Sequence, residues 1–130
     1  MKTKKLALIF LAFNLLFLLP GFAGGRKQGE MPAPRLLLPH DAVSLSGKSG
    51  VEFTWGNEGG GDFDHYDFTV YKGSQPYEPY ILVTKKLPKG TYSTTVESSY
   101  FQPGQTYNWS LRYGGSKRSM KSYSVFKIDS

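Results

Sequence analysis

The sequence predicts an all-β protein, a sandwich of about seven short antiparallel strands. Three observations favour this class. Apolar and polar residues alternate in short runs from residue 36 onward, which is the period-two pattern of half-buried strands. Turn-forming Gly, Pro, Asn and Ser residues separate these runs. Beyond residue 23, no segment carries the apolar spacing of an amphipathic helix.

The first half of the domain contains three expected strands. Residues 36–38 lie between two prolines, which suits an edge strand because proline cannot donate a ladder hydrogen bond. Residues 51–55 alternate apolar and polar side chains, and the Gly-rich segment 57–61 then turns the chain. Residues 66–70 follow with their aromatic side chains on one face and Asp67 on the other.

The second half contains the remaining expected strands. Residues 81–84 form a short candidate, and residues 94–97 form the next one. Residues 107–111 alternate apolar side chains with Asn and Ser, which predicts a strand with one buried face. The Gly pair at 114–115 opens a hairpin loop, and residues 123–128 close the domain.

Large apolar side chains on the inward positions of these strands have the size to fill the space of about 10 Å between two sheets. Burying one of them contributes about 1.5–3 kcal/mol, which matters in a chain without cysteine. The expected core consists of Phe53, Trp55, Phe68, Val70, Trp109, Leu111, Phe126 and Ile128.

The order of these segments resembles the fibronectin type III superfamily over roughly residues 34–128, in the form found in exported bacterial proteins. The matching segments are 34–39, 51–55, 66–71 and 101–109. In that family the tyrosine matched by Tyr107 hydrogen-bonds back across a corner, so the same bond is implied here. The sequence has no Arg-Gly-Asp triplet, so the resemblance does not imply integrin binding.

Residues 1–23 have the pattern of a secretory signal peptide, with lysines, an apolar run over 6–19 and small residues at 21 and 23. A run of about fourteen residues is shorter than the roughly 20 that a membrane-spanning helix needs, and an uncleaved anchor is the alternative. We expect cleavage after residue 23, a flexible lead-in at 24–34 and the sandwich at 35–130. The protein would then be secreted or held in the periplasm or cell envelope, with no membrane span.

The composition argues against several classes of function. The absence of cysteine excludes a disulfide framework, thiol catalysis and lipid attachment through cysteine. Three of the 16 Lys and Arg residues lie in the signal segment, which leaves 13 against 10 Asp and Glu and a mature net charge of +3. That charge is ordinary for a soluble domain, so we expect no nucleic-acid partner.

No catalytic, cofactor or metal site is expected. His40 and His65 are the only histidines, and the sequence has no Gly-x-Ser-x-Gly nucleophile motif. Carboxylate pairs for glycoside cleavage could be drawn from any chain that bears acids, here from Glu52, Glu58, Glu78 and Glu97. We therefore predict that the protein is not an enzyme.

An acidic cluster, residues 62–67, contains oxygen ligands of the kind that calcium prefers. Its members are Asp62, Asp64, His65 and Asp67. The cluster lacks the Asp-x-Asp-x-Asp-Gly order of a calcium loop, so we interpret it as a solvated loop and the outward face of the third strand.

Two segments are candidate binding surfaces. Tyrosine is more frequent than a core requires, at Tyr71, Tyr77, Tyr80, Tyr92 and Tyr100. Tyrosine is favoured in recognition surfaces, and segment 77–80 falls where an edge strand is expected, although its proline would also block unwanted strand pairing. The last hairpin is basic and could bind an anionic polymer, through Arg112, Tyr113, Lys117 and Arg118, with Lys121 and Tyr123 nearby.

The sequence thus favours a secreted, non-catalytic binding or scaffold domain in the cell envelope. Its partner would be an unknown protein or polysaccharide at the cell surface. The alternative is a carbohydrate-binding module that stacks sugars on exposed tyrosines. The candidate surface residues are Tyr77, Tyr80, Arg112, Tyr113, Lys117 and Arg118.

Overall fold

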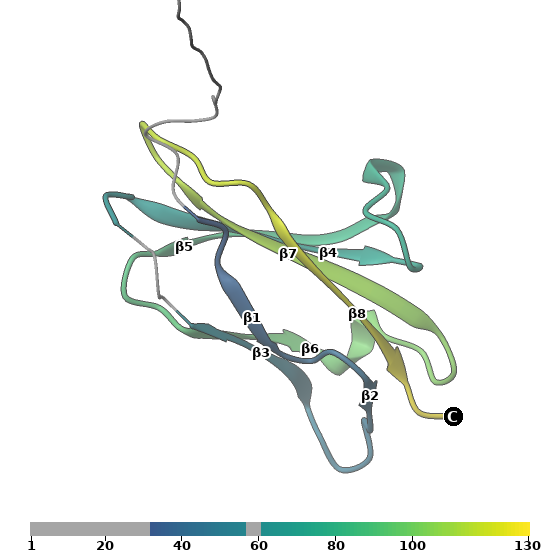
Figure 1. Ribbon diagram of the computed structural model, residues 1–130. Helices are drawn as coiled ribbons and strands as arrows, with labels where there is room; N and C mark the ends of the chain where they lie inside the picture. Colours follow the sequence, from purple (N-terminus) through teal and green to yellow (C-terminus); the bar gives the residue numbers. More distant parts are fainter. Residues whose placement is uncertain (1–31, 57–60) are drawn as a thin grey trace, which may run out of the picture. The chain divides into compact units, whose positions relative to one another are not determined.

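Eight strands and two short 3-10 helices make up the part of the chain that the computed structural model describes, residues 32–56 and 61–130. They form two sheets that pack face to face (Figure 1). The predicted signal peptide, most of the predicted lead-in and Glu58 lie outside the described residues. Among the described residues, no helix is long and apolar enough to cross a membrane.

The strand order is that of a fibronectin type III-like sandwich. The three-stranded sheet has the order β1 (Arg35–Leu38), β3 (Gly50–Gly56), β6 (Ser93–Glu97). The five-stranded sheet has the order β2 (Ala42–Val43), β8 (Ser122–Ile128), β7 (Thr106–Gly114), β4 (His65–Lys72), β5 (Ile81–Pro88). The helices are η1 (Glu78–Tyr80) and η2 (Ser98–Tyr100). The predicted fold class is confirmed.

Strand β2 was not expected from the sequence. It contains two residues and pairs with β8 in the parallel sense, whereas the other strand pairs of the described chain are antiparallel. Two residues are too few to show a period-two alternation, so β2 leaves no pattern in the sequence.

The core lies between the sheets, and all eight predicted core residues are buried. Phe53 of β3 joins the two sheets through edge-to-face contacts with three rings of the five-stranded sheet. Its ring centroid lies 5.1 Å from Phe68, 5.1 Å from Trp109 and 5.6 Å from Phe126. Each such aromatic pair contributes about 0.5–1.5 kcal/mol beyond its buried area.

The corner that precedes β7 has the hydrogen bond that the family resemblance implied. The backbone N–H of Gln102 donates to the Tyr107 hydroxyl oxygen over 2.9 Å. Because Tyr107 is also buried in the core, this bond fixes where the chain enters β7.

The segment 77–80 is not the expected edge strand. Its last three residues form η1, and β5 begins only at Ile81 and continues to Pro88. Pro79 lies in the first turn of η1, where its fixed φ angle favours a helical turn and its missing N–H costs nothing. The strand predicted at 81–84 begins where expected and is longer than predicted.

Candidate binding surface

The side of the five-stranded sheet that faces away from the core is called the outer face below. Tyr66, Phe68 and Val70 of β4 point into the core, so alternation makes the side chains that lie between them in the sequence point outward. The same rule applies to the strands that pair with β4 and β7. The outer face therefore carries Asp67, Thr69, Tyr71, Thr84, Lys86, Asn108, Ser110, Arg112, Tyr123 and Val125.

At one end of the outer face lies a polar depression of about 340 Å³, called the basic pocket below. Strands β4, β5 and β7 and the loop after β7 contribute to it. Its lining consists of His65, Asp67, Thr69, Thr84, Lys86, Arg112, Gly115, Arg118 and Lys121. Four cationic side chains thus surround one carboxylate.

That carboxylate is held by two neighbours on the same face. Arg112 Nε donates to Asp67 Oδ2 over 3.1 Å, and His65 Nε2 lies 3.2 Å from Asp67 Oδ1. Arg112 stands directly opposite Asp67 in the β4–β7 register, which places the two charges together. Both carboxylate oxygens are therefore engaged in the floor of the pocket.

The hairpin loop after β7 lies close against the start of β4 because two glycines leave room. A Cβ atom at Gly114 would lie 2.6 Å from His65 Nε2, and one at Gly115 would lie 2.6 Å from Asp64 Oδ2. Gly115 also has a φ of +131°, which other residues rarely adopt. The glycine pair predicted to open a hairpin thus also brings the loop to the edge of the basic pocket.

The expectation that Tyr113 belongs to the surface is wrong. Its side chain is buried, with its ring centroid 4.6 Å from that of Phe63 and 5.6 Å from that of Tyr66. Tyr113 has the same parity along β7 as Trp109 and Leu111, so it points to the core. It supports the basic pocket from beneath and cannot contact a ligand there.

The other predicted basic residues divide. Arg112 and Arg118 line the basic pocket, whereas Lys117 does not. Lys86 lines the pocket from β5, and sequence reasoning missed it because the strand was expected to end at residue 84. A predicted strand that ran beyond residue 84 would have included Lys86, which the observed register pairs with Asp67.

At the other end of the outer face, Tyr77 and Tyr80 form an exposed pair, called the tyrosine pair below. Their exposed fractions are 55% and 54%, and their ring planes meet at 79° with the centroids 5.1 Å apart. Tyr80 lines two depressions, of about 400 and 420 Å³, and Tyr77 lines the first of them. The pair and these depressions offer an aromatic corner to a ligand.

A buried amide fixes the connection that carries the tyrosine pair. Asn108 of β7 is 1% exposed, and its Nδ2 donates to the carbonyl oxygens of Gly73 and Gln75 over 2.8 and 2.9 Å. The Gly73 N–H donates in turn to the carbonyl oxygen of Thr106 over 2.8 Å. The connection between β4 and η1 therefore folds over the outer face and is tied to β7 by three hydrogen bonds.

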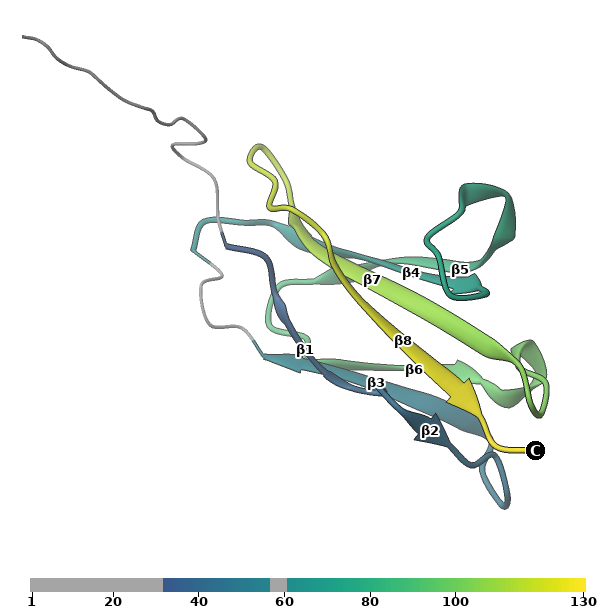
Figure 2. The ribbon, with the colours of Figure 1, turned by 45° about the vertical axis from the view of Figure 1, so that its right-hand side comes forward.

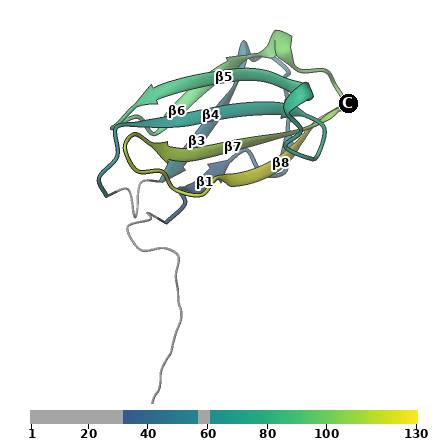
Figure 3. The ribbon, with the colours of Figure 1, turned by 90° about the horizontal axis from the view of Figure 1, so that it is seen from above.

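The tyrosine pair and the basic pocket lie at opposite ends of the same strands. Figure 2 shows the η1 connection and the β7–β8 loop on the side of the five-stranded sheet that faces away from the three-stranded sheet. Figure 3, seen from above, shows them at the two ends of β4 and β7. Strand β4 runs from His65 to Lys72, a distance of about 23 Å at roughly 3.3 Å per residue.

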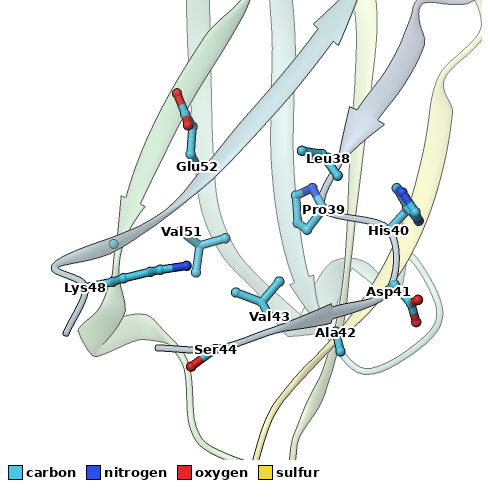
Figure 4. Close-up of a pocket in the computed structure, with 11 residues that line it drawn as sticks. Leu38, Pro39, His40, Asp41, Ala42, Val43, Ser44, Lys48, Val51 and Glu52 are labelled. Carbon is cyan, nitrogen blue, oxygen red and sulfur yellow. The ribbon is translucent and has the colours of Figure 1, made fainter. Parts of the chain in front are cut away.

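A further depression, of about 460 Å³, lies where the chain crosses from β1 to β2 (Figure 4). Strand β1 pairs with β3 only along Thr54–Gly56, and β2 pairs with β8, so the edge between β2 and β3 is open. The side chains of Val43 and Val51 point toward one another there. Charged side chains of both signs, including Lys48 and Glu52, stand at its rim.

The acidic cluster has no geometry for a metal in the described residues. Among these, no group of three or more His, Asp or Glu side chains is arranged to hold an ion. Asp67 instead faces Arg112 and His65, while Asp64 packs over Gly115. His40, the other histidine, lines the depression between β2 and β3.

Comparisons with known proteins find similarity to solved structures. No family model matches this chain, and no curated protein matches it. A solved fibronectin type III domain of human contactin 1 is similar at 16% sequence identity, with a TM-score of 0.48. The match covers 85% of this chain and 91% of that chain. The strand order and the buried core described above carry the assignment of the fold.

Proposed function

We propose that this chain is a secreted, non-catalytic binding domain that recognises a protein at the cell surface through the outer face of its five-stranded sheet. The observation that carries the proposal is the tyrosine pair, which stands exposed on a connection tied down by Asn108. The export pattern in residues 1–23 supports the location outside the cytoplasm.

Rigid presentation is what makes the tyrosine pair suited to recognition. Tyrosine offers a large contact area with few rotatable bonds, so binding orders little that was free before. The Asn108 hydrogen bonds hold the connection in place before a partner arrives, which further lowers the entropy lost on binding.

The arrangement of His65 and Asp67 supports a role without chemistry. A histidine that acts as a general base must lie within reach of the reacting group, and a carboxylate often orients it. Here Arg112 shares the carboxylate, and the set lies in an open, polar depression on a sheet. Such an arrangement is suited to binding a charged ligand.

A capture experiment tests the proposal. The chain, expressed from residue 1 with a C-terminal tag, is purified from the exported fraction and mixed with envelope and culture proteins. We expect a reproducible protein partner that is lost with Tyr77→Ala/Tyr80→Ala. Tyr100→Ala is the matched control. Tyr100 is 47% exposed, but it lies on η2, which directly follows β6 of the three-stranded sheet. Equal capture by the wild type and the double variant would contradict the proposal.

The second candidate function is carbohydrate binding through the same tyrosines, favoured by the two depressions that Tyr80 lines. The ring planes at 79° do not form one flat platform, so they would accept a single sugar ring in the corner. Glycan binding that requires both tyrosines, with no protein partner, would replace the first candidate by this one.

A further inference from the structure

We infer that the basic pocket binds the acidic group of an anionic polysaccharide, one that carries carboxylate or sulfate groups. The inference rests on the proposed function only in that it treats the outer face as a binding surface. The four cations come from three separate segments of the chain, β5, β7 and the loop after β7, and converge on one depression.

The charge of the pocket favours an anion. Lys86, Arg112, Arg118 and Lys121 line it, against the single carboxylate of Asp67. Asp64 lies beside Gly115 at its edge and reduces the excess without removing it. A cluster of charges of one sign in a concave site that is partly shielded from solvent raises the local concentration of ligands with the opposite charge.

The floor of the pocket is fixed before a ligand binds. Among the residues that the structure describes, the Arg112 guanidinium donates to Asp67 through Nε alone, so its two terminal Nη groups can donate to an acidic oxygen of a ligand. The exposed fractions of the Asp67 and Arg112 side chains are 29% and 26%, so both are reached by solvent yet seated in the sheet. A guanidinium held in this way can donate two parallel hydrogen bonds to a carboxylate or sulfate.

Hydroxyl groups and the carboxylate distinguish a sugar from other anions. Thr69 and Thr84, which carry hydroxyl groups, line the pocket, and each Asp67 oxygen can accept a further hydrogen bond beside its contact with Arg112 or His65. A sugar acid presents hydroxyl donors beside its anionic group, so it can satisfy both the cations and these acceptors. The phosphodiester backbone of DNA has no hydroxyl donor beside its charge, so it cannot donate a hydrogen bond to Asp67.

The lining also argues against single-stranded nucleic acid. Recognition of unpaired bases relies on aromatic side chains on which the bases stack. Among the described residues that line the pocket, the imidazole of His65 is the one aromatic ring. Tyr113, the nearest tyrosine on β7, is turned into the core.

The test compares two double variants that lower the net charge equally. Arg118→Gln/Lys121→Gln removes two cations from the pocket, and Lys117→Gln/Lys127→Gln removes two exposed cations that do not line it. The full chain, purified after export, is titrated with polygalacturonate, dextran sulfate and neutral dextran. Poly-glutamate and single-stranded DNA represent the other two classes of anion.

We expect binding to at least one of the two anionic polysaccharides, none to neutral dextran, and weaker binding to poly-glutamate and DNA. The pocket variant should lose about tenfold in affinity, because each cation contacts the anion directly, and the control should lose less than about threefold. Equal losses in both variants, tighter binding to poly-glutamate or DNA, or no binding to either polysaccharide would each overturn the inference.

The outcome is separable from that of the proposed function. Tyr77→Ala/Tyr80→Ala changes the opposite end of the outer face, about 23 Å away along β4. Loss of a captured protein with this variant tests the proposed function, whereas polysaccharide affinity of the pocket variant tests the present inference. Either result can fail while the other stands.

Discussion

The two ends of the outer face are held in place by different kinds of interaction. At the tyrosine end, the side-chain amide of Asn108, 1% exposed, donates two neutral hydrogen bonds to the loop backbone. At the basic end, Arg112 forms an ion pair with Asp67, and His65 Nε2 lies 3.2 Å from the same carboxylate; these side chains are 21–29% exposed. The same two strands, β4 and β7, carry both sets.

This difference bears on how each end responds to solution conditions. A buried neutral hydrogen bond is scarcely affected by salt, whereas partly exposed ion pairs weaken as the ionic strength rises. The conformation of the tyrosine end should therefore be the same over a wide range of salt concentration, whereas the ion pair of the basic end should weaken as the salt concentration rises. The measurements below separate the two ends on this basis.

The largest expected effect follows from Asn108→Ala. The substitution removes both amide hydrogen bonds, so the Gly73 carbonyl loses this donor and the Gln75 carbonyl keeps only the N–H of Tyr77. It should lower the free energy of unfolding by about 1–3 kcal/mol. Urea denaturation measures this loss. Hydrogen exchange should show faster exchange of the Gly73 amide, which donates to Thr106 in the same connection.

Ser110→Ala is the matched control for that change. Ser110 lies two residues further along the same face of β7, is equally buried, and its Oγ has no hydrogen-bond partner among the described residues. Replacing it with an apolar residue should be nearly neutral or slightly stabilising. If Ser110→Ala costs as much as Asn108→Ala, the cost comes from packing on the outer face and the amide has no special role.

The sequence predicted the core better than the outer face, and the reason is physical. Core positions such as Phe53 and Trp109 are set by alternation and size, which a single strand reveals. Tyr113 could have been placed by the same parity, but it was assigned to the surface because of the basic residues around it. The basic composition of the segment thus gave the wrong position for Tyr113, whereas alternation along β7 gives the right one.

The binding surface depends on register, which the sequence does not show. Lys86 meets Asp67, and Asp67 meets Arg112, only because three strands pair in one alignment. Asn108 had been treated as an outward polar residue of a strand, and nothing in its neighbours indicates the loop that it binds some 35 residues earlier. The sequence predicts an edge strand around Pro79 in which the proline blocks unwanted pairing, whereas Pro79 lies in η1.

A smaller effect is expected for the ion pair of the basic end. A double-mutant cycle with Asp67→Asn and Arg112→Gln should give a coupling energy of about 0.2–1 kcal/mol, the range measured for exposed pairs. Urea is the denaturant, because guanidinium would itself screen the charges. At 1 M NaCl, where the Debye length is about 3 Å, the coupling should fall substantially.

The Asn108→Ala loss provides the internal reference for that cycle. It should be the same at low and high salt, because no charge is involved. A coupling between Asp67 and Arg112 that stays constant at 1 M NaCl would show that the pair acts as a fixed hydrogen bond, and the contrast between the two ends would then disappear.

The last prediction concerns Tyr66, which lies beneath the basic pocket. Its ionisation has the smallest effect on stability near neutral pH, because the effect appears only at alkaline pH. Burial raises the pKa of Tyr66 above the ordinary value of 10.0. Above about pH 10 an unfolded tyrosine loses its proton while the folded Tyr66 keeps it, so the unfolded state binds fewer protons and stability falls as pH rises. The contribution of Tyr66 is therefore complete below pH 10 and is lost as the pH passes its raised folded value.

Tyr66→Phe tests this sign, because it removes the ionisable hydroxyl and keeps the ring that packs against Phe63 and Tyr113. The free energy of unfolding, measured by urea at several pH values, should fall less steeply above pH 10 in the variant than in the wild type. Tyr100→Phe changes an exposed tyrosine and serves as the control, with the slope of the wild type expected. A Tyr66→Phe slope equal to that of the wild type would mean that water reaches this hydroxyl in the folded protein, and that the aromatic layer under the basic pocket is open.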